Sequence, residues 1–72
     1  MAEFCDRLKE LRNSKKIKQQ EMADMLGIQL RAYQCYEYGE HYPVLDSVIK
    51  IADFFDVSLD YLVGRSDVKE RR

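Results

Sequence analysis

An alanine followed four residues later by a glycine, within one amphipathic stretch, is the feature that most constrains this chain. The two residues are Ala23 and Gly27, and the stretch is Gln19–Tyr38. Glycine adopts a positive φ without steric cost, so Gly27 predicts a tight turn between two short helices. A small side chain such as Ala23 lets two helices approach closely where they cross. We therefore expect helices over Gln19–Leu26 and Gln29–Tyr38.

The apolar positions of this two-helix unit fall on the inner faces of its helices. They are Met22, Leu26, Ile28, Tyr33 and Tyr36. Such faces must pack against other elements of the chain. Tyr33 and Tyr36 are interpreted as core aromatics whose hydroxyls reach the surface, with a stacking role as the alternative.

Three further helices are predicted from apolar residues at helical spacing. They lie over Glu3–Asn13, Val44–Asp56 and Leu59–Val63, the last with Ser58 as its N-cap. Pro43 keeps the preceding loop out of the helix, and no strand pattern occurs. The sequence predicts an all-α, compact five-helix domain over residues 1–66, followed by a charged, frayed tail at 67–72.

Composition excludes several classes of function. The chain has 72 residues, enough for one domain with a single small core. It has no apolar run of the roughly 20 residues that span a bilayer, and no basic start typical of a signal peptide, so we expect a cytoplasmic protein without membrane contact. Cys5, Cys35 and His41 lack metal-site spacing. No nucleophile–base pair or phosphate-binding glycine loop is present, so we expect no enzyme, metal or cofactor.

The charge is unevenly distributed although the net charge is only −1. Residues 7–18 hold six basic residues and one acid, a balance of +5, whereas residues 19–64 hold two basic residues and eight acids, a balance of −6. A basic segment on an acidic body attracts phosphate locally. The alternative for Lys15–Lys18 is an ordinary solvated loop.

The spacing over Gln19–Tyr38 matches a helix-turn-helix, and the resemblance extends from about Phe4 to Gly64. The chain resembles the XRE family of Cro and phage-repressor-like transcription regulators. The stretches that carry this similarity are Arg7–Arg12, Gln19–Ala23, Tyr36–Gly39, Pro43–Leu45, Lys50–Asp53 and Val57–Gly64. The resemblance implies a helix-turn-helix formed by the second and third helices, with the third lying in the major groove of double-stranded DNA.

The resemblance also implies which residues contact DNA. Base reading is expected from the start of the third helix, by Gln29, Leu30, Arg31, Gln34 and Cys35. Arginine pairs with guanine, glutamine with adenine, and leucine packs on a thymine methyl. The alternative is that these residues are only the solvent face of a short helix.

Phosphate binding is expected around the start of the second helix, where free N–H groups and the helix dipole favour an anion. The expected residues are Arg12, Lys16, Lys18, Gln19, Tyr38 and Tyr42. For Arg12 the alternative is an ion pair with an acid of the first or fourth helix. Glu37 is interpreted as structural, bonding backbone groups or an arginine of the first helix. Lys18 and Gln29 stand where the family often has Ser or Thr caps.

The function that the resemblance implies is repression by a homodimer bound to a palindromic operator. We expect the dimer interface within Asp56–Gly64, at Leu59, Tyr61 and Leu62. The alternative is an antitoxin-like or regulator-binding module that uses the same fold to bind a protein. Activation through contact with RNA polymerase also stays open.

Overall fold

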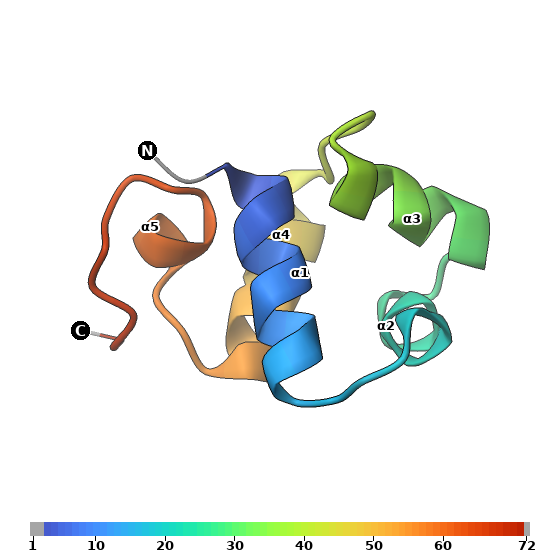
Figure 1. Ribbon diagram of the computed structural model, residues 1–72. Helices are drawn as coiled ribbons and strands as arrows, with labels where there is room; N and C mark the ends of the chain where they lie inside the picture. The colour runs from blue at the N-terminus through green and yellow to red at the C-terminus, as the bar shows by residue number, and fades with distance from the viewer. Residues whose placement is uncertain (1–2, 72) are drawn as a thin grey trace.

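The structure is a computed structural model that describes residues 3–71. In this range the chain forms five helices and no strand: α1 (Phe4–Ser14), α2 (Gln19–Leu26), α3 (Leu30–Tyr38), α4 (Leu45–Phe55) and α5 (Leu59–Leu62). In Figure 1, α1 runs through the middle, with α2 and α3 on one side, α5 on the other and α4 behind. The predicted all-α fold with five helices is confirmed.

The core lies where the inner faces of all five helices meet. Its fully buried members include Leu8, Met22, Tyr33, Ile51 and Leu62. Ala23 is also fully buried, at the place that the sequence reserves for a small side chain. The helical spacing of the apolar residues therefore predicted most of the packed faces. Leu45 is the exception, because it shares the apolar spacing of Val48, Ala52 and Phe55 but is 64% exposed.

Helix ends follow the local backbone rules. Gly27 ends α2 at φ 69°, and Gly39 ends α3 at φ 78°, both in the left-handed region that glycine tolerates. Ser58 caps α5, since its Oγ accepts the N–H of Tyr61 at 3.0 Å. Gln29 and Val44 have extended backbones and precede their helices instead of starting them. These two helices therefore begin one residue later than predicted.

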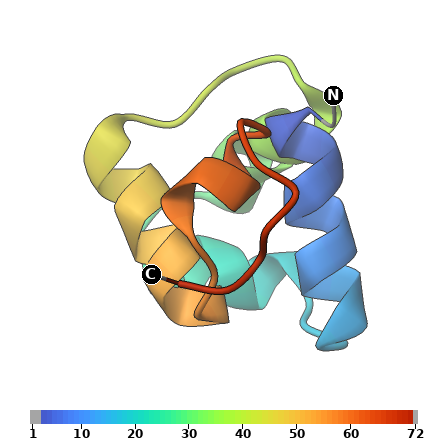
Figure 2. The ribbon, with the colours of Figure 1, turned by 90° about the vertical axis from the view of Figure 1, so that its left-hand side faces the viewer.

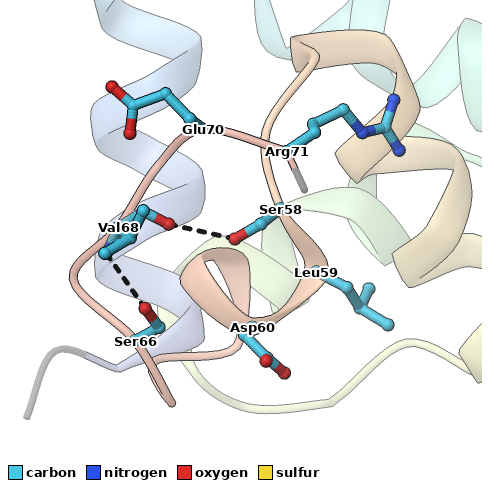
Figure 3. A pocket seen from close by; sticks show the side chains of 7 residues that line it. All are labelled: Ser58, Leu59, Asp60, Ser66, Val68, Glu70 and Arg71. Carbon is cyan, nitrogen blue, oxygen red and sulfur yellow. Dashed lines mark hydrogen bonds between the residues drawn. The ribbon is translucent and has the colours of Figure 1, made fainter.

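The segment after α5 folds back instead of extending away from the domain. The backbone N–H of Ser58 donates to the Lys69 carbonyl at 2.9 Å, and Ser58 Oγ donates to the Val68 carbonyl at 3.1 Å. Figure 3 shows that this segment and the start of α5 together line an open pocket. Arg71 forms ion pairs with Asp53 and Asp56 near the end of α4. Residues 67–71, predicted to be frayed, are thus bonded to the domain, while Arg72 lies outside the described residues.

Arg7 holds the returning segment to α1. Its side chain is only 9% exposed, and its guanidinium stacks 3.8 Å from the ring centroid of Tyr61. It donates hydrogen bonds to the carbonyls of Tyr61 and Ser66 and to the carboxylate of Asp67. An arginine counted in the basic segment is therefore part of the interior.

Candidate nucleic-acid interface

Helix α3 has an inner side bonded to the domain and an outer side open to solvent. Tyr33 and Glu37 face inward and are buried. The outer side is a shallow depression lined by Arg31, Gln34, Cys35, Tyr38 and Glu40. Three of the five residues predicted to read bases therefore lie together on one surface.

The two other predicted base-reading residues lie at the start of α3. Gln29 is exposed as the N-cap residue, and Leu30, the first helical residue, is partly buried. Neither Gln29 nor Lys18 makes a side-chain cap bond to its helix. At the start of α2 the missing side-chain cap is compensated by Glu21, whose carboxylate accepts a hydrogen bond from the backbone N–H of Lys18 at 3.2 Å.

The turn between α2 and α3 fixes how α3 is presented. Because Gly27 is left-handed, the chain reverses there, and the N–H of Ile28 bonds to the carbonyl of Ala23 at 3.0 Å. Buried Ala23 then allows close approach of the two helices, and Ile28 packs against the core. The predicted helix-turn-helix geometry is thus present over Gln19–Tyr38.

A buried carboxylate at Glu37 joins α3 to α1 and α2. Its side chain is 1% exposed and accepts two hydrogen bonds from Arg12, at 2.5 Å from Nε and 3.1 Å from Nη2. It also accepts the Tyr33 hydroxyl at 2.5 Å and the Gln19 amide at 3.1 Å. We call these residues, together with Gln34, the Glu37 network.

Electrostatics in the Glu37 network follow from these bonds. Burial alone would raise the pKa of Glu37, but the hydrogen bonds from Arg12, Tyr33 and Gln19 outweigh it and lower the pKa below its ordinary value of 4.5. Burial, followed by the bond to Glu37, raises the pKa of Tyr33 far above the ordinary value for a phenol. The carboxylate is therefore ionised and the phenol neutral at physiological pH.

Two sequence predictions are corrected by the Glu37 network. The sequence predicts that Arg12 binds phosphate, but its Nε and Nη2 donate to Glu37 and its Nη1 donates to the Ile17 carbonyl at 2.8 Å. Its guanidinium is therefore engaged within the chain. The Tyr33 hydroxyl was expected at the surface, but it is buried against Glu37. The interpretation of Glu37 as the partner of a first-helix arginine agrees with the structure.

The network reaches the outer side of α3 through two glutamines. Gln34 Nε2 donates to Gln19 Oε1 at 3.1 Å, while Gln19 Nε2 donates to Glu37. Glu37 thus orients Gln19, which is predicted to hold phosphate, and through Gln19 it orients Gln34, which is predicted to read bases. Sequence reasoning missed this link; the signal available was a carboxylate on an otherwise apolar helix face.

Cations and free N–H groups gather at the start of α2. Lys16 and Lys18 are exposed, and neither forms an ion pair within residues 3–71. The first N–H groups of α2, at Gln19 and the residues after it, have no partner in the helix. Such a helix end attracts an anion. Tyr38 and Tyr42, both 59% exposed, present hydroxyls further along, and the Tyr42 ring lies 4.8 Å from that of Phe4.

The residues predicted for a dimer interface do not form one surface. Tyr61 and Leu62 are buried in the core, and Leu59 is 37% exposed. Tyr61 is covered by Arg7, which stacks on its ring. The prediction for Tyr61 and Leu62 is therefore corrected, because both side chains are already packed within the chain.

Within residues 3–71, no cluster of three or more His, Cys, Asp or Glu side chains is arranged to hold a metal ion. None of the helices in this described range has the length and apolar character needed to cross a membrane.

Comparison with known proteins gives consistent matches. The helix-turn-helix family model matches residues 8–62. The chain is 48% identical over 67 residues to YqaE, an uncharacterized HTH-type transcriptional regulator of Bacillus subtilis, covering 92% of this chain and 58% of that protein. It is 42% identical over 60 residues to RstR, a cryptic phage CTXphi transcriptional repressor of Vibrio cholerae, covering 83% and 54% respectively.

A solved structure supports the same relationship. The crystal structure of a transcriptional regulator from Listeria innocua is similar with a TM-score of 0.84 at 32% identity, covering 86% of this chain and 58% of that one. The chain thus spans less than two thirds of the length of each of these proteins.

Proposed function

The chain belongs to the XRE-type helix-turn-helix family of transcriptional regulators, and we propose that it represses transcription as a homodimer bound to a palindromic operator. The observation that carries the proposal is the two-sided α3. Its inner side is fixed by the Glu37 network, and its outer side presents Arg31, Gln34 and Cys35 to solvent. A rigid helix with polar side chains exposed on one side is suited to reading base edges in the major groove.

In this proposal, base and phosphate contacts have separate roles. Exposed Arg31 pairs with guanine O6 and N7, and Gln29 or Gln34 pairs with adenine. Leu30 packs on a thymine methyl. Lys16, Lys18 and the start of α2 hold phosphate, with Gln19 oriented for the same task by its bonds to Glu37 and Gln34. Tyr38 and Tyr42 add hydroxyl donors to the backbone.

Repression is the regulatory outcome that we propose. It is supported by the similarity to RstR, whose name describes a transcriptional repressor. An operator that overlaps a promoter would then be blocked by occupancy alone. The proposed place of action is the cytoplasm, where a cellular regulator of this family would meet its DNA. RNA polymerase is a partner only if the bound protein activates transcription.

Fluorescence anisotropy and selection from a random duplex pool test the proposal. We expect affinity for a random duplex to fall steeply with salt, because bound lysines release counterions. Selection should yield a palindrome. On that site Arg31→Ala should weaken binding about 5- to 150-fold, equivalent to about 1–3 kcal/mol. Lys18→Ala should weaken binding to all sequences alike.

Arg65→Ala is the matched control for loss of one exposed arginine. Arg65 lies after α5, away from α3, and is exposed. Its substitution should leave the selected sequence unchanged. Absence of binding to any duplex at low salt would overturn DNA binding for this chain and favour the protein-interaction module. A selected site without two-fold symmetry would overturn the palindromic operator.

A further inference from the structure

Helix α4 carries an apolar surface that nothing within residues 3–71 covers. Leu45 is 64% exposed, Ile49 is 41% exposed, and Val44 just before the helix is 70% exposed. Leu45 and Ile49 are four residues apart, so they lie on one face of the helix, one turn from each other. Figure 2 shows α4 along one flank of the molecule, with α1 on the opposite flank. We call Val44, Leu45 and Ile49 the α4 face.

One acid and one base lie together on one edge of the α4 face. Asp46 and Lys50 are both exposed and also four residues apart. Within residues 3–71, neither takes part in an ion pair. The neighbouring carboxylates of Asp53 and Asp56, in contrast, are both paired with Arg71. The free charges beside the α4 face are therefore of both signs and at a defined spacing.

We propose that the α4 face is the contact between two copies of this chain, with their α4 helices packed antiparallel about a two-fold axis. In this arrangement Leu45 of each copy packs against Ile49 of the other. Asp46 and Lys50 then lie on the same edge of the contact and meet Lys50 and Asp46 of the other copy. A second copy is the natural occupant because the surface is complementary to itself in both apolar contacts and charge.

The small size of the α4 face makes this a weak dimer. A standard protein interface buries about 1,200–2,000 Å² in total, more than three side chains with their surroundings can supply. Two half-sites on one duplex would hold two copies close together, and this higher effective concentration would favour the dimer. The inference thus rests on the proposed function for its role, but not for the existence of the contact. This inference places the dimer interface on α4 instead of on α5, where the sequence predicted it and where Tyr61 and Leu62 are buried.

Sedimentation equilibrium of the chain without DNA, from about 10 µM to 1 mM, tests the contact. We expect reversible dimerisation of the wild type. Asp46→Lys and Lys50→Asp each turn two attractive pairs into two repulsive ones, so each should raise the dimer dissociation constant at least about tenfold. The double variant Asp46→Lys/Lys50→Asp restores opposite charges across the axis and should recover dimerisation. Leu45→Ser should abolish it.

Leu59→Ser is the matched control for the loss of an exposed leucine. Leu59 is 37% exposed and lies at the start of α5, outside the α4 face. Its substitution should leave the dissociation constant unchanged. Circular dichroism checks that every variant is folded. A wild type that stays monomeric to 1 mM, or a double variant no better than the single ones, would overturn the proposed contact.

Failure of the contact is distinguishable from failure of DNA binding. The double variant keeps the net charge, so its affinity for a random duplex at low salt should equal that of the wild type. Charge-dependent dimerisation without any duplex binding would leave the contact standing and remove the proposed function. Duplex binding with no charge-dependent dimerisation would do the reverse.

Discussion

Replacing Glu37 by glutamine should be among the most destabilising single substitutions in this chain. The carboxylate accepts four hydrogen bonds, two from Arg12 and one each from Tyr33 and Gln19. A glutamine keeps the shape but has one acceptor oxygen, and its amide N–H₂ would face a donor. It also leaves the Arg12 guanidinium, 15% exposed, without a counter-charge. Breaking a buried pair in this way costs about 3–5 kcal/mol.

The magnitude matters because a domain of this size has little stability in reserve. At about 0.05–0.15 kcal/mol per residue, the free energy of unfolding is roughly 4–11 kcal/mol for the whole chain. Glu37→Gln should therefore remove about a quarter of it or more. Urea unfolding followed by circular dichroism measures the change. Glu40→Gln, three residues further along and exposed, is the control and should leave the unfolding midpoint in place.

The same substitution changes how stability depends on pH. The pKa of Glu37 is lower in the folded chain than its ordinary value of 4.5, so its contribution is complete above about pH 4.5. It is lost as the pH falls through the folded pKa. The unfolding free energies of wild type and Glu37→Gln should therefore converge in acid. A loss below about 1 kcal/mol at neutral pH, or a difference that does not shrink in acid, would refute the reasoning about this carboxylate.

Two further predictions concern other buried groups. The raised pKa of Tyr33 should keep its phenol neutral in alkali. An absorbance titration should therefore show one tyrosine that ionises only when the chain unfolds, and Tyr33→Phe should abolish that step. An unchanged titration in Tyr33→Phe would contradict this assignment. Arg7→Met removes three hydrogen bonds and the stacking on Tyr61, so urea unfolding should show a loss of about 2–4 kcal/mol. Asp67→Asn removes only one of these bonds, at a side chain that is 99% exposed, so it should cost no more than about 1 kcal/mol. Equal effects of these two substitutions would contradict the buried role of Arg7.

The sequence was sufficient to predict the helices because their causes are local. Gly27 and Gly39 adopt the positive φ that the turns require, and Ser58 caps α5 as expected. The helix starts at Gln29 and Val44 were placed one residue early because neither residue carries a strong capping side chain. Apolar spacing identified the core, since burial follows the helical period.

The partners of charged side chains could not be predicted, because they depend on packing between distant elements. Arg12 and Glu37 are separated by 25 residues, and Arg7 and Asp67 by 60. Both arginines belong to a segment that reads as a basic stripe, and both are engaged within the chain. Lys16 and Lys18 of this segment are exposed, and phosphate binding stays the role that we propose for them.

The separation of α3 into two sides has a consequence for how proteins of this design diverge. Tyr33 and Glu37 bind α3 to the rest of the domain, whereas Arg31 and Cys35 make no side-chain hydrogen bond within residues 3–71. If the outer residues read base edges as proposed, exchanging them would change the preferred base pairs while leaving the helix in its place. New binding preferences can therefore arise by one or two substitutions at little thermodynamic risk. Gln34 is the exception, because its amide is shared with Gln19.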